Sequence, residues 1–389
     1  MRILFIDHGQ YITVAVPKLI EMAETLVAQG HSVEIALTHR TNRFRAERFE
    51  KNGVVYHAFP SLMWGKLRHG ACPWDMLRRT LFYGSHFDFD IIHARDSRPN
   101  VIFPALYLRK RFKVPVVLEW ADLFSGGGTI SERSGRLYSH TLGAVETFFE
   151  KGFRLKADGA AVVSSFLRDE LLKMGFPSDR ILISRNGGIM SEGHLVSKED
   201  ARKMVGWDSE LVYALFLGRI FPRDLKLLTE AIATAAESHP ELKVVMAGDI
   251  PENERINHPN LCYEGRVPDD RLQNIGRAVD FCVLPMKLSL ANRARWPSKI
   301  GSYFSFGKPV LSTPVSDFSE IYREADVGIL CNDTVEAFAD GLCRMVESQD
   351  RWEEWGKNTF DYGRRNLDWP IIMDNLVTFY EKVLQHATK

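Results

Sequence analysis

The segment LVYALFLGRIFPRDLKLL, residues 211–228, places a buried apolar strand directly before a helix. The strand is predicted to end at Gly218, and the helix is predicted to begin around Asp224. Comparable apolar runs alternate with helical patterns on both sides, from ILFI at residues 3–6 to GKPVLST at residues 307–313. Because such alternation is typical of parallel sheets covered by helices on both faces, the sequence predicts an α/β fold.

The apolar runs fall into two series, which predict two domains. Between them lies SRNGGIMSEGHLVSKED, residues 184–200, where glycines and charges interrupt the periodicity. A length of 389 residues also favours two hydrophobic cores over one. We expect an N-terminal Rossmann-like domain over residues 1–188 and a C-terminal one over residues 189–365. A final helical segment, residues 366–389, is expected to pack on the N-terminal domain.

Composition disfavours several classes of protein. Lys+Arg and Asp+Glu number 50 each, so the net charge gives no reason to expect nucleic-acid binding. Five scattered cysteines without metal-ligand or redox spacing indicate a reducing compartment. The start MRILFID lacks the features of a signal peptide, and no segment approaches the roughly 20 apolar residues of a membrane span. We expect a cytoplasmic protein whose membrane contact, if any, is peripheral.

Ligands of open α/β sheets bind beyond the carboxyl ends of the strands, so the loops there hold the candidate site residues. In DHGQY, residues 7–11, Gly9 either lets backbone approach a phosphate or only forms a turn. It belongs to no GxGxxG motif, which disfavours a dinucleotide oxidoreductase. Arg219, Arg223 and Lys226 crowd a strand end and a helix start, where cations are disfavoured unless an anion binds. A diphosphate site is favoured there over a solvated basic loop.

A second candidate loop is ARWPSKIGSYFSFGKPVLST, residues 294–313. Pro297 fits a first helical position, and Gly307 is expected to end the helix. Ser298 and Lys299 offer a hydroxyl and a cation at the helix start. Lys299 is therefore either an anion-binding residue or an exposed surface lysine.

A third candidate loop is EWADLFSGGG, residues 119–128, in which a glycine run follows a strand end. Its acidic residues are Glu119 and Asp122. Carboxylates at this position either bind sugar hydroxyls or cap a helix, and the residues alone leave both readings open.

Together these segments resemble the retaining GT-B glycosyltransferases of family 4. The resemblance rests on ADGAAVVSSFLRDELLKMGFPSDRILISRNGG, residues 157–188, with the FLGRI and SFGKPVLST segments, and it extends to about residue 365. It implies two Rossmann-like, doubly wound parallel-sheet domains that face each other across a cleft. The second domain would hold a nucleoside-diphosphate sugar, whose diphosphate would be neutralised by Arg219 with Lys226 or Arg223.

The resemblance also implies further donor contacts and shows departures from the family pattern. EGRVP resembles the loop whose backbone reads the nucleobase, which implies Arg266 and Val267. The family's two glutamates, eight positions apart, fall on Ala294 and Ser302, so Ser302 takes the position of the ribose-binding acid. Ser298 and Lys299 are expected to replace part of that missing acidic pair.

In the fourth-strand loop the family's His falls on Ala121, which leaves Asp122 as the catalytic candidate. The implied reaction transfers a sugar to a hydroxyl of a carbohydrate or lipid-linked acceptor with retention of configuration. It needs no cofactor and no metal. Two alternatives remain, a catalytically inactive GT-B scaffold that binds a partner and a sugar-nucleotide 2-epimerase.

A basic surface in the N-terminal domain predicts contact with an anionic membrane. Residues 1–115 hold 17 Lys+Arg against 10 Asp+Glu. Two segments there mix basic and large apolar residues, a composition that suits an anionic lipid surface. Their named residues are Trp64, Lys66, Arg68, Trp74, Arg78, Arg79, Arg109, Lys110, Arg111 and Lys113. The alternative is that the tryptophans pack in the core and the arginines form an ordinary solvated face.

Overall fold

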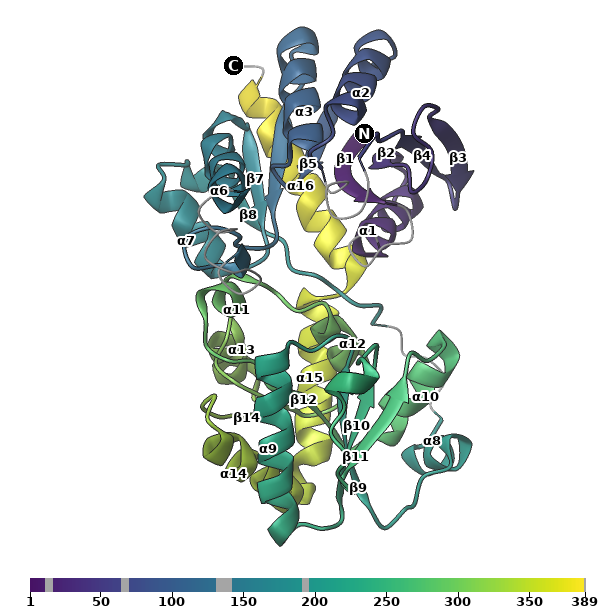
Figure 1. Ribbon diagram of the computed structural model, residues 1–389, viewed down its shortest axis with the longest axis vertical. Helices are drawn as coiled ribbons and strands as arrows, with labels where there is room; N and C mark the ends of the chain where they lie inside the picture. Colours follow the sequence, from purple (N-terminus) through teal and green to yellow (C-terminus); the bar gives the residue numbers. More distant parts are fainter. Residues whose placement is uncertain (11–16, 64–69, 131–141, 191–195, 388–389) are drawn as a thin grey trace. The chain divides into compact units, whose positions relative to one another are not determined.

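The computed structural model describes residues 1–10, 17–63, 70–130, 142–190 and 196–387. Its contacts divide the chain into two compact units (Figure 1). Unit 1 comprises Met1–Arg185, Ala294–Trp296 and Trp369–Lys389, and unit 2 comprises Asn186–Arg293 and Pro297–Asp368. Each unit is built on its own mainly parallel sheet with helices, so the predicted fold class of two α/β domains is confirmed.

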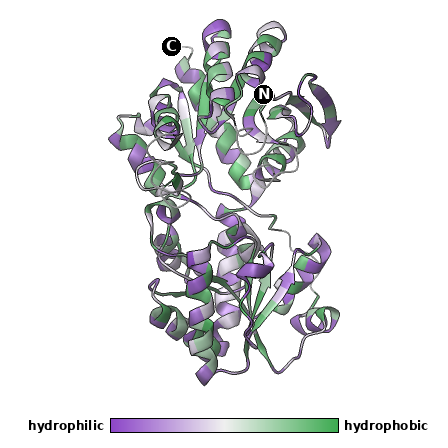
Figure 2. Cartoon of the chain, viewed as in Figure 1, coloured by the Kyte–Doolittle hydropathy of each residue, from purple (hydrophilic) through white to green (hydrophobic). Residues whose placement is uncertain are grey.

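The sheet of unit 1 has eight strands in the order β3-β4-β2-β1-β5-β6-β7-β8. Neighbouring strands run parallel, except that β3 pairs antiparallel with β4 at one edge. Figure 2 shows β3 as a hydrophilic edge strand, which suits its exposed position. The strands are β1 Arg2–Gln10, β2 Ser32–Thr38, β3 Glu47–Lys51, β4 Val54–Phe59, β5 Ile91–Arg95, β6 Val116–Trp120, β7 Gly159–Val162 and β8 Ile181–Ile183.

Alternate residues of β1 enter two different cores, because successive side chains of a strand point to opposite faces. Ile3 and Phe5 join the core that contains α1 and α16, whereas Leu4 and Ile6 join the core that contains α2 and α3. The last helix of the chain thus contributes to the core of unit 1. The helices are α1 Pro17–Ala28, α2 Pro73–Ser85, α3 Pro99–Phe112, α6 Leu142–Gly152, α7 Ser165–Lys173 and α16 Trp369–Ala387.

The sheet of unit 2 has six strands in the order β11-β10-β9-β12-β13-β14, and all of its neighbouring strands run parallel. Its strands are β9 Val212–Leu217, β10 Leu242–Ala247, β11 Leu261–Gly265, β12 Phe281–Leu284, β13 Val310–Ser312 and β14 Gly328–Leu330. Its helices are α8 Lys198–Val205, α9 Pro222–Ser238, α10 Asp269–Ala278, α11 Leu290–Ala294, α12 Lys299–Ser305, α13 Phe318–Ala325, α14 Val335–Glu347 and α15 Trp352–Asn366.

Two predicted helix starts differ from the structure. Helix α9 begins at Pro222 rather than around Asp224, because proline lacks the N–H that would be unpaired there and already has a helical φ. Helix α12 begins at Lys299, after Ser298, so the prediction that Pro297 occupies a first helical position is wrong. The carbonyl of Pro297 instead accepts a hydrogen bond from the N–H of Ile300 at 3.1 Å.

Arg79 braces the packing of α2 on the sheet from a fully buried position. Its guanidinium donates to Asp75 at 2.6 Å, to the carbonyl of Asp7 at 2.7 Å and to the hydroxyl of Thr38 at 3.0 Å. Asn100 of α3 also donates to Asp75, at 2.6 Å. The brace therefore connects two helices and two strands of unit 1, and Arg79 is not part of an exposed basic surface as the sequence suggested.

Removing this guanidinium is predicted to destabilise the chain strongly. Arg79→Leu leaves the Asp75 carboxylate buried without its cation, and breaking such a pair costs about 3–5 kcal/mol. Urea unfolding measures the change. The matched variant Arg78→Leu, at a half-exposed neighbour on the same helix, is expected to shift the free energy of unfolding by no more than about 0.5 kcal/mol. If both variants lose the same free energy of unfolding, the stabilising role proposed for Arg79 is contradicted.

Candidate functional site

In unit 2 the strand order reverses between β9 and β12. The chain passes from β9 to β10 and β11 on one side, and then returns to place β12, β13 and β14 on the other. Only two residue pairs join β9 to β12, Ala214 with Phe281 and Leu215 with Cys282. Because ligands of α/β sheets bind beyond the carboxyl ends of strands at such a reversal, this edge is the candidate donor site of unit 2.

Tyr303 of α12 connects the two strands beyond their last paired residues. Its fully buried hydroxyl accepts a hydrogen bond from the N–H of Leu217 at 3.0 Å and donates one to the carbonyl of Val283 at 3.1 Å. These backbone groups would otherwise be buried without partners, which is costly. The hydroxyl therefore fixes α12 against the ends of β9 and β12.

Lys299 lies four residues before Tyr303 and so on the same face of α12. Its ammonium nitrogen is 3.3 Å from the carbonyl oxygen of Arg219 and 3.6 Å from the ring centroid of Phe216. Burial lowers the pKa of Lys299 to about 7, although the charge of Asp224 acts in the opposite direction. Lys299 is half-buried at the strand end, and the predicted exposed-lysine alternative does not describe it.

The first turn of α9 is tied to the loop that follows β12. The buried carboxylate of Asp224 accepts a hydrogen bond from the N–H of Lys287 at 2.9 Å, and the ammonium of Lys287 donates to the carbonyl of Asp333 at 2.5 Å. Arg223 donates to the hydroxyl of Ser289 at 3.1 Å. These contacts hold the loops on both sides of the reversal in place.

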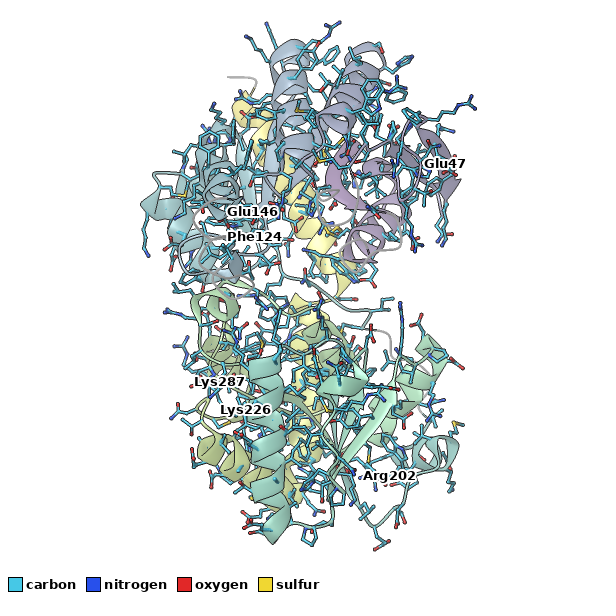
Figure 3. All side chains as sticks on the ribbon, in the orientation of Figure 1. Glu47, Phe124, Glu146, Arg202, Lys226 and Lys287 are labelled. Carbon is cyan, nitrogen blue, oxygen red and sulfur yellow. The ribbon has the colours of Figure 1, made fainter. Side chains whose placement is uncertain are left out.

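The remaining predicted phosphate-binding residues occupy different positions. Arg219 is exposed immediately after Gly218, whose φ of +77° is a conformation that favours glycine. Lys226 is exposed on α9, where Figure 3 labels it, and it lies 3.7 Å from Glu230 of the same helix. The structure therefore brings Arg219 and Lys299 together at the end of β9, while Lys226 lies further along α9.

The other predicted donor contacts also lie in unit 2. Arg266 is exposed and Val267 is half-buried in the loop between β11 and α10. Ser298 is exposed, and its hydroxyl accepts a hydrogen bond from the side chain of Asn186 at 2.9 Å. Ser302 is half-buried within α12. No interaction among the described residues distinguishes Arg266 as a nucleobase contact, so that role stays a prediction.

In unit 1 the predicted residues are Gly9 and Asp122. Gly9 is buried within β1, and its backbone N–H donates a hydrogen bond to the carboxylate of Asp7 at 2.5 Å. This N–H, which was predicted to approach a phosphate, therefore already has a partner within the chain. Asp122 is half-exposed in the loop after β6, 3.8 Å from Arg295. Both lie at the carboxyl edge of the sheet of unit 1.

Sequence reasoning missed an ionic network around Glu119 at that edge. The buried carboxylate accepts from Arg95 at 2.9 Å and from Lys18 at 3.1 Å, and lies 3.2 Å from the ring of His93. Burial alone would raise the pKa of Glu119, but these cationic neighbours hold it well below its usual value. Arg95 also pairs with Asp7 at 2.8 Å. The charged residues that directly follow the buried strand IIH were the available signal.

The predicted membrane surface is corrected in part by the structure. Arg79 is buried in the brace, and Arg109 pairs with Asp158 at 2.6 Å. Trp64, Lys66 and Arg68 lie outside the described residues. Among the described residues, no helix is long and apolar enough to cross a membrane. The same part of the chain holds no group of three or more His, Cys, Asp or Glu side chains arranged to bind a metal.

Two parallel-sheet α/β units are the architecture of the GT-B fold, which the chain shares with solved glycosyltransferases. Residues 18–187 match the model of the glycosyl transferase 4-like domain, and residues 212–348 match the model of glycosyl transferases group 1. The chain is therefore a family 4-like glycosyltransferase of the GT-B type, as the sequence resemblance predicted.

Individual relatives are distant in sequence. TuaH of Bacillus subtilis (strain 168), a glycosyltransferase provisionally assigned to teichuronic acid biosynthesis, is 23% identical over 283 residues, covering 70% of this chain and 68% of the relative. Sucrose-phosphate synthase of Thermosynechococcus elongatus has a TM-score of 0.78 at 15% identity over 99% of this chain and 100% of that one. HepE of Anabaena in complex with UDP-glucose has a TM-score of 0.68 at 15% identity over 100% of this chain and 99% of that one.

The lowered pKa of Lys299 predicts a pH dependence of stability. Because the unfolded chain keeps the lysine proton up to about pH 10.5 while the native state loses it near pH 7, the unfolded state binds more protons in between. Stability contributed through this residue therefore rises with pH from about 7 to about 10.5. We expect the wild type to gain stability relative to Lys299→Met over this interval in urea unfolding at several pH values.

If the difference in free energy of unfolding between the wild type and Lys299→Met stays constant from pH 7 to 10.5, the lowered pKa of Lys299 is contradicted. NMR of the lysine side chains provides the direct measurement, with a midpoint for Lys299 at about 7. Lys226→Met is the matched control, because the Lys226 side chain is 73% exposed and its substitution should add no such difference.

Proposed function

We propose that this glycosyltransferase moves a sugar from a nucleoside-diphosphate sugar to a hydroxyl of a carbohydrate or lipid-linked acceptor, with retention of configuration. The observation that carries the proposal is the position of Lys299, whose ammonium lies 3.3 Å from the backbone carbonyl of Arg219, just beyond the end of β9 in unit 2. HepE, solved with UDP-glucose, and TuaH, provisionally assigned to teichuronic acid biosynthesis, support a sugar nucleotide as donor and a glycan as acceptor.

In this proposal the diphosphate binds at the reversal of strand order. Arg219 supplies a guanidinium suited to bidentate phosphate contacts, and Lys299 supplies an ammonium that is already poorly solvated. An anion beside Lys299 restores the proton that burial displaces, so binding gains a charge-assisted hydrogen bond. Arg223 and Lys226 are secondary contacts. The loop with Arg266 and Val267 faces the nucleobase, and Pro297, Ser298 and Ser302 line the donor near α12.

The chemistry follows from the charge that develops on the leaving group. The bond between the anomeric carbon and the diphosphate oxygen breaks, its electron pair leaves with the diphosphate, and the acceptor oxygen bonds to the anomeric carbon. Preorganised cations stabilise that charge, and one such contact contributes about 3–4 kcal/mol to lowering the barrier. The leaving phosphate accepts the acceptor proton on the same face, which gives retention. The cations carry the charge without a metal ion, and Asp122 contacts the transferred sugar.

Arg219→Ala is predicted to abolish most transfer and to weaken UDP binding while leaving uridine binding unchanged. A hydrogen bond to a charged group contributes about 1.5–3 kcal/mol, so UDP affinity should fall at least tenfold. Calorimetry with UDP and with uridine separates the two effects, and a panel of UDP- and GDP-sugars with p-nitrophenyl glycosides measures transfer. Lys226→Ala should have the smaller effect, because Lys226 is solvated and pairs with Glu230.

The control is Arg323→Ala. Its side chain is 76% exposed and its ion pair with Glu320, at 3.9 Å, lies within α13, so UDP binding should not change. Equal UDP affinity in Arg219→Ala and the wild type would remove Arg219 from the donor site. An epimerised sugar nucleotide recovered without release of UDP would replace transfer by 2-epimerase activity.

If the acceptor is lipid-linked, we expect unit 1 to contact the surface of an anionic membrane. Lys110, Arg111 and Lys113 are exposed at the end of α3, beside Tyr107 and Phe112, whose side chains are also exposed. Each basic residue near an anionic leaflet contributes about 1 kcal/mol, and aromatic rings favour the headgroup region.

Binding to anionic vesicles is expected in co-sedimentation at low salt, and it should weaken with added salt. Reversing two charges in Lys110→Glu/Arg111→Glu should lower the bound fraction at least tenfold. Lys382→Glu, at an exposed position of α16, is the control and should change it less. Failure of the wild type to sediment with anionic vesicles would leave a non-membrane acceptor as the better assignment.

A further inference from the structure

His8 lies at the strand-order reversal of unit 1. In this sheet β1 has β2 on one side and β5 on the other, and the chain fills the β2 side before it turns to β5 through β8. Asp7 of β1 is level with Arg95 of β5. The next residues along the two strands, His8 and Asp96, therefore lie side by side where α/β sheets bind ligands.

The His8 ring is held between two carboxylates without a hydrogen bond. Its Nδ1 is 3.8 Å from Asp96 and 4.0 Å from Asp7, and this buried atom has no hydrogen-bond partner among the described residues. The side chain is still 21% exposed, so the rest of the ring reaches solvent. Because most buried polar atoms in native proteins are hydrogen-bonded, the exception requires an explanation.

Asp96 is held in place by an unusual backbone conformation. Its φ is +75°, a left-handed value that costs energy for any residue other than glycine and that concentrates at functional sites. The N–H of Ser97 donates to its carboxylate at 2.6 Å, and Arg98 lies 3.6 Å away. Burial alone would raise the pKa of Asp96, but the charge of Arg98 and the Ser97 hydrogen bond are among the interactions that lower it, so the carboxylate stays ionised.

Asp7 and Arg154 are the other charged side chains near this pair. Asp7 makes a short ion pair with Arg95 at 2.8 Å, and Arg154, whose charge also acts on Asp96, is buried with its guanidinium 3.9 Å from the ring centroid of Trp120. Asp96 is nearer to Nδ1 than Asp7 and its ion pair with Arg98 is longer, at 3.6 Å, so it is the carboxylate better placed to orient His8. A carboxylate beside Nδ1 places the ring proton there, which leaves Nε2 of the neutral ring as a hydrogen-bond acceptor.

We propose that unit 1 contains a sugar-hydroxyl site in which Nε2 of His8, oriented by Asp96, accepts a hydrogen bond from a substrate hydroxyl. The proposal rests on the proposed glycosyl transfer. The hydroxyl belongs either to the acceptor or to the sugar being transferred, since both present the same group. Occupation of the site shortens the contact between Nδ1 and Asp96, as such contacts tighten when substrate binds.

The test compares His8→Phe, His8→Gln and Asp96→Asn with the wild type, using UDP-glucose and a p-nitrophenyl glycoside as substrates. His8→Phe should raise the KM of the substrate that carries the hydroxyl at least fivefold, because that hydroxyl loses its partner. His8→Gln should recover part of the loss, since its amide oxygen still accepts. Asp96→Asn should give an intermediate KM, because asparagine tolerates a positive φ but does not fix the ring proton.

Two controls separate the loss of this contact from a general effect on the protein. UDP affinity, measured by calorimetry, should stay within twofold of the wild type in every variant. His86→Phe, at an exposed histidine after α2, is the matched control and should leave KM unchanged.

The substrate whose KM changes identifies the source of the hydroxyl. A raised KM for the glycoside assigns the site to the acceptor, and a raised KM for UDP-glucose with unchanged UDP affinity assigns it to the transferred sugar. Unchanged KM for both in His8→Phe and His8→Gln overturns the proposal.

NMR of the imidazole nitrogens of the wild type decides the matter without turnover or mutation. The Nε2 signal of His8 should shift when the glycoside or UDP-glucose is added, and an unmoved signal at saturating concentrations of both overturns the site. If the wild type transfers no sugar, the proposed function fails, whereas this titration still tests the hydroxyl site separately.

Discussion

The requirement that buried backbone groups be hydrogen-bonded shapes both candidate sites. Where a parallel sheet reverses its strand order, two neighbouring strands diverge and their last N–H and C=O groups lose their ladder partners. In unit 2 the hydroxyl of Tyr303 supplies both missing bonds, to Leu217 and Val283. Since that hydroxyl fixes α12, it also fixes Lys299 one turn earlier, beside the carbonyl of Arg219. The position of the cation thus depends on the backbone constraint.

The carboxyl edges of the two sheets differ in how their charged side chains are paired. In unit 1 the buried Arg95 is matched by two carboxylates, those of Asp7 and Glu119. In unit 2 Arg219 is exposed, and Lys299 is desolvated enough that its pKa falls to about 7. A sheet edge where each cation is paired with a carboxylate suits neutral hydroxyl groups. A sheet edge where cations lack carboxylate partners suits an anion such as a diphosphate. The proposed function, with the donor held mainly by unit 2 and sugar hydroxyls contacted by unit 1, would make use of this division.

The sequence predicted the two sheets because their strands are continuous apolar runs, and burial on both faces produces that pattern directly. It also located Arg219 after a strand end and Lys299 at a helix start. It failed for Arg79, whose neighbours in a basic, aromatic segment suggested a surface, because the buried Asp75 partner is decided only by how α2 packs. It missed His8 for a related reason. The histidine becomes notable only when β1 and β5 are adjacent and Asp96 lies beside it.

The loss of the family's two acids is understandable in the same physical terms. Ala294 is fully buried, and its carbonyl accepts a hydrogen bond from the hydroxyl of Ser164 at 2.6 Å. A glutamate there would place a carboxylate at a fully buried position, which is costly unless a cation pairs with it. With the family's carboxylates missing from this segment, Asp224 is the acidic residue whose charge favours the protonated form of Lys299. In the proposed function the diphosphate would be the anion that pairs with this lysine, and its binding would favour the protonated form of the lysine.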